Sequence, residues 1–141
     1  MLTFTALASH PWAYPALETI HLFGVALLIG NLVLVELRVW GLGSVLAVRP
    51  LASLCLRLVG LGALLCVITG LLMFATQPAE LLANRAFTLK MLLLVAAATN
   101  AVWFHLRGSL DRLDFVARFS ALVSLLIWLS VLALGRWIAY V

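Results

Sequence analysis

The sequence predicts an all-α membrane protein, a four-helix transmembrane bundle, from three observations. Of the 141 residues, 66% are hydrophobic and only 10% are charged, which is more apolar side chain than a domain of this size can enclose. Four apolar runs each approach the roughly 20 residues that cross a hydrocarbon core as a helix. The connections between them are too short for a soluble domain. We therefore expect a single transmembrane domain, residues 1–141, with helices over approximately 16–37, 51–75, 87–106 and 115–137.

Boundary residues support each of these spans. Proline is tolerated in the first turn of a helix, so we expect the first span to begin after Pro15 and the second to open at Pro50. The third span follows Asn84, a residue type that caps helices well. Because the loop before Asn84 is short, the second and third helices are predicted to pack as antiparallel neighbours.

The basic residues predict the orientation in the membrane. The positive-inside rule places connections rich in Lys and Arg in the cytoplasm. Only three basic residues lie toward the side opposite to the first and third connections: Arg85, Lys90 and Arg136. Both termini are therefore expected on the outer, periplasmic side of a cell inner membrane, in a multi-pass protein. The other six basic residues flank the first and third connections: Arg38, Arg49, Arg57, Arg107, Arg112 and Arg118.

The composition also limits the classes of partner. Residues 1–15 contain no basic segment and no small-residue cleavage site, so we expect the first span to act as its own insertion signal. No basic stripe interleaved with aromatic residues remains for nucleic acid, which we exclude as a partner. The expected partners are the lipid bilayer and further copies of the chain, because so short a bundle exposes much packing surface.

Three ionisable residues are predicted to share one layer near the outer side. At 1.5 Å per residue, His21 lies about 9 Å and Lys90 about 10 Å outward from the centres of their spans. Glu18 lies one turn further out than His21 and about 60° around the helix. Ionisable groups inside a span usually face the bundle interior and find partners. Glu18, His21 and Lys90 are therefore expected to converge on one pocket.

Other polar residues are predicted to lie deeper. Asn31 and Asn100 fall about 6 and 4 Å to the inner side of the centre, so we expect them to form a second layer. Glu36 and His105 are closer still to the cytoplasmic surface and are interpreted as residues whose polar ends reach the interface. His105 is roughly 20 Å in depth from His21. These two histidines therefore cannot ligate one metal within a subunit.

The outer residues allow three interpretations. Histidine is the commonest side chain that binds haem or a transition metal, and a desolvated Lys90 can serve as a second ligand. Alternatively, His10, Glu18 and His21 could bind copper or zinc. In the third interpretation Glu18 and Lys90 form only a buried ion pair that fixes helix register, with His21 hydrogen-bonded beside it. Cys55 and Cys66 lie eleven residues apart on one helix, too far apart to form a disulfide, and are expected to be inert.

Several stretches carry a resemblance to known families. The segments "PWAYPALETIHLFGVALLIGN", "ELRVWG", "TGLLMF", "NRAFTLK" and "NAVWFH" resemble an uncharacterised family of small four-span bacterial inner-membrane proteins. More distantly, a histidine early in the first span and a lysine early in the third look like the HemJ-type protoporphyrinogen oxidases, which bind b-type haem. The layout also looks like the CopD-type copper-resistance membrane domains. The HemJ resemblance implies haem binding at His21 and Lys90.

Together these observations predict a b-type haem-binding integral membrane protein, an oxidoreductase toward a quinol or porphyrinogen if it is an enzyme. His21 would be an axial ligand, and Lys90 a second ligand or a partner of a haem propionate. Glu18 would orient His21 or relay protons, with Asn100 as a further cofactor-binding candidate. The alternatives are a copper or other metal handling protein that uses His10, Glu18 and His21, and a structural or accessory subunit of a membrane complex.

Overall fold

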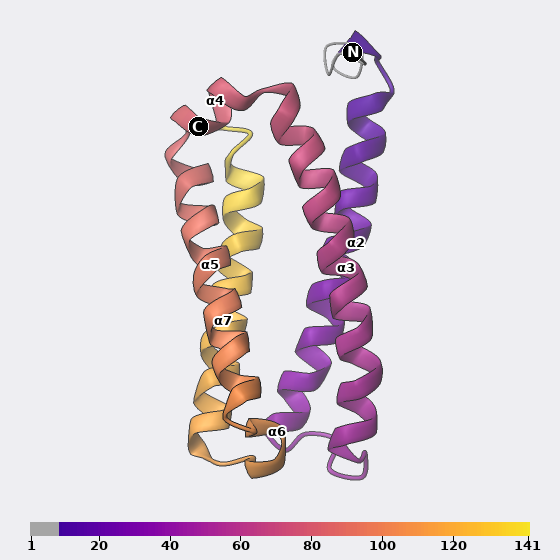
Figure 1. Ribbon diagram of the computed structural model, residues 1–141, viewed down its shortest axis with the longest axis vertical. Helices are drawn as coiled ribbons and strands as arrows, with labels where there is room; N and C mark the ends of the chain where they lie inside the picture. The colour runs from indigo at the N-terminus through magenta and orange to yellow at the C-terminus, as the bar shows by residue number, and fades with distance from the viewer. Residues whose placement is uncertain (1–8) are drawn as a thin grey trace.

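The computed structural model describes residues 9–141, and all of the secondary-structure elements in this range are α-helices (Figure 1). By length and composition, four of the described helices can cross a membrane, as the sequence predicts. Two short helices lie in the connections between them. The long helices are α2 (Ala13–Val39), α3 (Val48–Thr76), α5 (Arg85–Leu106) and α7 (Phe115–Trp137), and the short ones are α4 (Pro78–Ala83) and α6 (Ser109–Arg112).

Helices α2, α3 and α5 begin two or three residues earlier than predicted, whereas α7 has the predicted bounds. Pro15 and Pro50 are each the third residue of their helix, rather than preceding or opening it. The first four backbone N–H groups of a helix have no partner within the helix, so proline costs nothing there. Asn84 caps α5 as predicted, since its side-chain oxygen accepts hydrogen bonds from the backbone N–H groups of Ala86 at 2.9 Å and Phe87 at 3.2 Å.

The bundle is built from two helix pairs. Helix α2 packs along α3, α5 packs along α7, and a smaller contact between α2 and α7 joins the pairs (Figure 1). The prediction that the second and third spans pack as neighbours is wrong for most of their length, because α3 and α5 make few contacts. They meet where α3 ends and α5 begins, at the stacked rings of Phe74 and Phe87, whose centroids lie 5.8 Å apart. The connection between the two helices contains α4 (Figure 1).

The α2–α3 pair depends on a close approach between two glycines. A Cβ atom built on Gly62 would lie 2.5 Å from the carbonyl oxygen of Gly24 and 2.6 Å from the backbone nitrogen of Leu28. No side chain can occupy that space, so the two backbones are in direct contact. Small residues that allow such contact are the usual basis of helix association in membranes.

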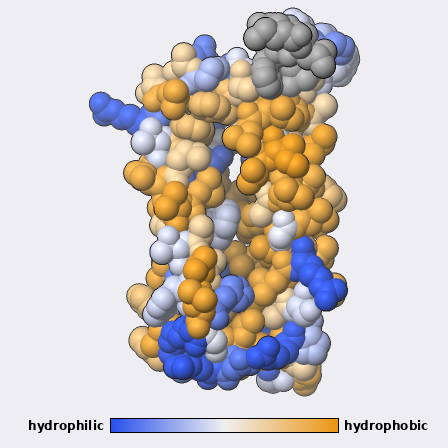
Figure 2. Space-filling view, in the orientation of Figure 1, coloured by the Kyte–Doolittle hydropathy of each residue, from blue (hydrophilic) through white to orange (hydrophobic). Residues whose placement is uncertain are grey.

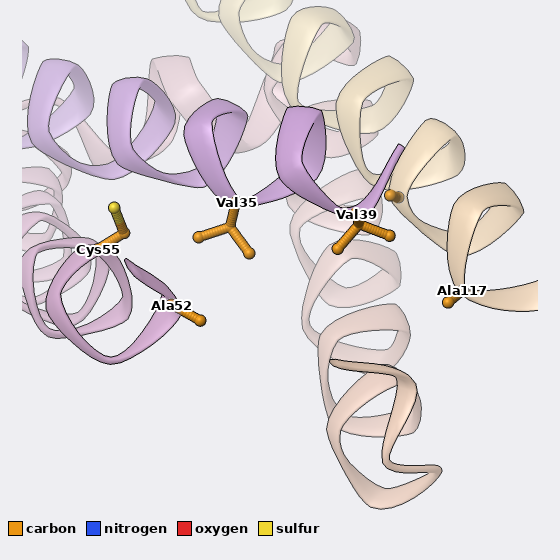
Figure 3. Packing of buried hydrophobic residues seen from close by; sticks show 6 residues of the cluster. Val35, Val39, Ala52, Cys55 and Ala117 are labelled. Carbon is orange, nitrogen blue, oxygen red and sulfur yellow. The ribbon is translucent and has the colours of Figure 1, made fainter. Parts of the chain in front are cut away.

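A small apolar cluster joins the two pairs near the connections. Val35 and Val39 of α2 lie between α3 and α7 (Figure 3). Beside them the indole Nε1 of Trp40 donates a hydrogen bond to the backbone oxygen of Arg118, at 3.0 Å. The pairs are therefore fixed to each other at this end. The buried members of the cluster are Val35, Val39, Ala52, Cys55, Ala117 and Ala121.

The two basic connections lie at the same end of the molecule. The Nε of Arg49, at the start of α3, donates to Oδ1 of Asp111 in α6 at 2.9 Å. Hydrophilic residues gather at this end, while the sides of the bundle are mostly hydrophobic (Figure 2). Large apolar side chains such as Leu54, Leu92 and Leu126 are more than half exposed on those sides. This surface is compatible with a lipid bilayer around the helices.

Arg107 and Asp114 close the turn between α5 and α7. The guanidinium donates to both carboxylate oxygens of Asp114, which also accepts from the backbone N–H of Ala117 as the cap of α7. The hydrogen bonds from Arg107, followed by that from Ala117, lower the pKa of Asp114 to about 2. The same pair raises the pKa of Arg107.

The glycine contact gives a direct test of the α2–α3 packing. Gly62→Ala forces two backbones apart, so we expect it to lower the free energy of unfolding by about 1–3 kcal/mol. Gly60, two residues earlier on α3, has open space where its Cβ would stand. Gly60→Ala should therefore be neutral or slightly stabilising. Reversible unfolding in detergent micelles measures both variants, and equal effects would contradict the close approach.

The lowered pKa of Asp114 predicts a pH dependence of stability. The folded state favours the ionised side chain. Its contribution to the free energy of unfolding is therefore fully present above the ordinary aspartate pKa of about 4. That contribution is lost as the pH falls from there through about 2. Thermal unfolding followed by circular dichroism should show a smaller loss of stability over this range in both Asp114→Asn and Arg107→Gln. An unchanged dependence in both variants would show that the pair is not linked to folding.

Candidate functional site

His21 is held between the two helices of the first pair. Its Nδ1 lies 2.8 Å from the hydroxyl oxygen of Thr69, a buried residue of α3. That hydroxyl lies 2.6 Å from the backbone oxygen of Leu65, a distance that requires the hydroxyl proton between them. A threonine hydroxyl has one proton, so it must accept from His21. The imidazole therefore carries a proton on Nδ1, and in the neutral ring this leaves a lone pair on Nε2.

Two neighbours of Thr69 complete the contact of α3 with His21. A Cβ on Gly70 would lie 3.6 Å from the imidazole Cε1, so the ring packs against a position without a side chain. The thiol of Cys66 lies 3.7 Å from the backbone oxygen of His21 and donates toward it. From the sequence, Cys66 is expected to be inert, and Thr69 is not among the candidate site residues. Only the pairing of α2 with α3 shows that both contact His21.

Lys90 belongs to the second helix pair. Its ammonium packs against Gly135 of α7, where an added Cβ would lie 3.3 Å from Nζ. The Lys90 charge interacts electrostatically with His21 and with Cys66 across the boundary between the pairs. A furrow with hydrophilic residues inside it runs between the two halves of the bundle (Figure 2). The structure thus brings Lys90 near His21 without a hydrogen bond between them.

Glu18 lies at the edge of this group. It is exposed on α2, one turn before His21, and interacts electrostatically with that residue. Within residues 9–141 it forms no ion pair with Lys90, because the two stand on different helix pairs and Glu18 faces outward. The predicted Glu18–Lys90 ion pair is therefore wrong.

The predicted copper ligands do not come together. His10 is exposed in the turn before α2, where its Nδ1 accepts from the backbone N–H of Trp12 at 3.4 Å. In the part of the chain that the structure describes, no three His, Cys, Asp or Glu residues form a group that could hold a metal ion. His10 thus lies before α2, and Glu18 and His21 are separate positions in its first turns.

Asn100 lies away from the outer residues, about 15 Å along α5 from Lys90 at 1.5 Å per residue. Its side-chain oxygen accepts from the Ser120 hydroxyl at 2.9 Å, and its amide donates to the Ser120 backbone oxygen at 3.1 Å. Asn31 instead donates to its own helix, at the backbone oxygen of Leu27. Asn31 and Asn100 therefore form hydrogen bonds to different partners, and Asn100 links α5 to α7.

Glu36 also differs from its prediction. Its side chain does not reach the protein surface, since the residue is buried with only 5% of its surface exposed. His105 is exposed near the end of α5, as expected of a residue at the interface. The burial of Glu36 follows from its position on the face of α2 that meets α7, which the sequence of one helix does not show.

Comparisons with family models, with curated proteins and with solved structures find no match for this chain. The resemblance to the four-span inner-membrane family, to the HemJ-type oxidases and to the CopD-type domains therefore stays a prediction.

The hydrogen bond between Thr69 and His21 is directly testable. Thr69→Val keeps the shape of the side chain but removes the acceptor for Nδ1–H, at an expected cost of about 1 kcal/mol in unfolding free energy. The ring nitrogens of His21 should then lose their fixed tautomer, which ¹⁵N NMR of labelled histidine detects. Thr76→Val is the matched control, because the Thr76 hydroxyl bonds only to the Met73 backbone oxygen. Identical ¹⁵N spectra for wild type and Thr69→Val would contradict the assignment.

Proposed function

We propose that the protein is a b-type haem-binding membrane protein with His21 as an axial ligand. The observation that supports this proposal is the hydrogen bond from His21 Nδ1 to Thr69. In the neutral imidazole this bond fixes the tautomer whose Nε2 can coordinate iron. A histidine that binds a metal through one ring nitrogen typically donates a hydrogen bond from the other. Haem supplies one-electron oxidation and reduction when it is bound.

Lys90 is the second residue of the proposed site. It belongs to the other helix pair, and its charge interacts with His21. Its ammonium would neutralise a haem propionate, or its free amine would be the second axial ligand. Glu18, exposed beside His21, would accept or release protons at the outer surface. The substrate class would be a lipid-soluble reductant such as a quinol or porphyrinogen.

The same proposal includes a location and an assembly. The basic connections of the first and third spans lie together at one end of the molecule, which supports a cytoplasmic location for that end. His21 would then lie on the periplasmic side of an inner membrane. The many exposed apolar side chains along the helices would contact lipid or further copies of the chain.

An absorbance spectrum of the purified protein tests the proposal. Wild type from cells supplied with a haem precursor should show a Soret band, and His21→Ala should abolish it. His105→Ala is the control, because that residue lies roughly 20 Å in depth from His21 and should leave the band intact. A Soret band that survives loss of His21 would contradict the assignment of the ligand.

Two further measurements separate misfolding from loss of a ligand. In His21→Gly, added imidazole should restore the Soret band if the surrounding pocket is intact. Lys90→Met should shift the band if Lys90 is a ligand, and should weaken haem retention without a shift if it neutralises a propionate. A colourless wild-type protein would overturn the haem proposal. It would favour the accessory-subunit alternative, in which the His21–Thr69 hydrogen bond only joins α2 to α3.

A further inference from the structure

A second polar site lies at the opposite end of the bundle from His21. Glu36 is buried at 5% exposure, and neither of its carboxylate oxygens has a hydrogen-bond partner among the described residues. The Ser124 hydroxyl on α7 interacts with the carboxyl but does not reach hydrogen-bonding geometry with either oxygen. An ionised carboxyl without partners is strongly disfavoured in a low-dielectric interior. The burial of Glu36 therefore needs a physical explanation.

A cavity of about 50 Å³ lies against the Glu36 side chain, between α2, α5 and α7. This volume is enough for at least one water molecule, which needs polar neighbours to be stable there. Glu36 supplies such neighbours with its two free oxygens. The other polar side chains that line the cavity are Asn100, His105, Ser120 and Ser124.

The lining is poorly suited to a metal cation. Hard cations take about six or more oxygen ligands. Asn100 and Ser120 are already hydrogen-bonded to each other, which leaves the Glu36 carboxyl and the Ser124 hydroxyl. Among the described residues that line the cavity there is also no Lys or Arg to balance a carboxylate. A proton and a water molecule match this environment better than a metal ion does.

The groups that face Glu36 from the packed helices are few. Helix α3 contributes Leu56 to the cavity, and its Cys55 lies in the adjacent apolar cluster. Helix α7 contributes the hydroxyls of Ser120 and Ser124, and α5 contributes His105. His105 both lines the cavity and is exposed one residue before the end of α5. It is thus the ionisable group between Glu36 and the surface.

We propose that Glu36 is a proton-binding site that exchanges with water at the basic end of the bundle, through the cavity and His105. When the site is occupied, the Glu36 carboxyl carries the proton. On release, the O–H bond of the acid breaks and the proton passes through cavity water to His105 and then to bulk water, which leaves a carboxylate. Rebinding reverses these steps, and no oxidant or reductant is consumed. The proposal does not depend on haem binding at His21.

Infrared spectroscopy of the protein in lipid films tests it directly. A protonated carboxylic acid absorbs above the amide I band, so wild type at neutral pH should show such a band. Transfer from H₂O to D₂O should shift it to lower frequency, because the proton exchanges with water. Glu36→Gln should abolish the band. Glu18→Gln is the control on the same helix and should retain it, since Glu18 is exposed.

Two additional variants test the route and guard against misfolding. Ser124→Ala should change the frequency of the band, because the hydroxyl is the neighbour of the carboxyl. His105→Ala should slow the deuterium shift by several-fold while it leaves the band intensity unchanged. An equal exchange rate in wild type and His105→Ala would overturn the route.

Three outcomes would overturn the site itself. The first is that no acid band appears at neutral or mildly acidic pH in wild type. The second is that the band persists in Glu36→Gln. The third is that addition of sodium at constant pH removes the band, which would identify a cation and not a proton as the ligand. All of these readouts are independent of the Soret band, so failure here and failure of the haem proposal can be distinguished.

Discussion

The direct backbone contact between α2 and α3 is the constraint on which the rest of the structure depends. Gly24 and Gly62 allow the two helices to touch, and any larger residue at Gly62 would collide with the facing backbone. Thr69 lies about two turns beyond Gly62, and His21 about one turn before Gly24. The glycine contact therefore sets the distance at which the Thr69 hydroxyl can accept from the His21 ring.

The second constraint is the uneven contact between the helix pairs. The apolar cluster around Val35 and Val39 joins them at the end with the basic connections, and the Arg49–Asp111 pair links those connections. No comparable cluster joins α3 to α5 in the described part of the chain. At the other end the stacked rings of Phe74 and Phe87 connect α3 to α5, and the Lys90 charge interacts with His21 across the boundary between the pairs.

The two polar sites differ in the hydrogen bonds that His21 and Glu36 form. His21 has a defined donor role toward Thr69, and its remaining nitrogen is free for a ligand. Glu36 is buried, its carboxyl oxygens have no hydrogen-bond partner among the described residues, and a cavity lies beside it. A lone pair with a fixed direction suits coordination, whereas an uncompensated carboxyl suits a mobile proton. A site that takes electrons and a site that takes protons would occupy opposite ends of α2.

The sequence by itself determined four helices long and apolar enough to cross a membrane, the cap at Asn84, and the positions of His21 and Lys90 along their helices. These properties depend on hydropathy, local hydrogen bonding and the fixed rise of a helix, which are properties of single segments. Tertiary structure decided which helices pair, and so which partners each polar residue finds. Thr69 beside His21, Ser120 beside Asn100 and the buried Glu36 all depend on contacts between helices that are distant in sequence. Packing fixes which face of each helix meets its neighbour. In a helix that is apolar on nearly all sides, the hydrophobic periodicity does not predict that face.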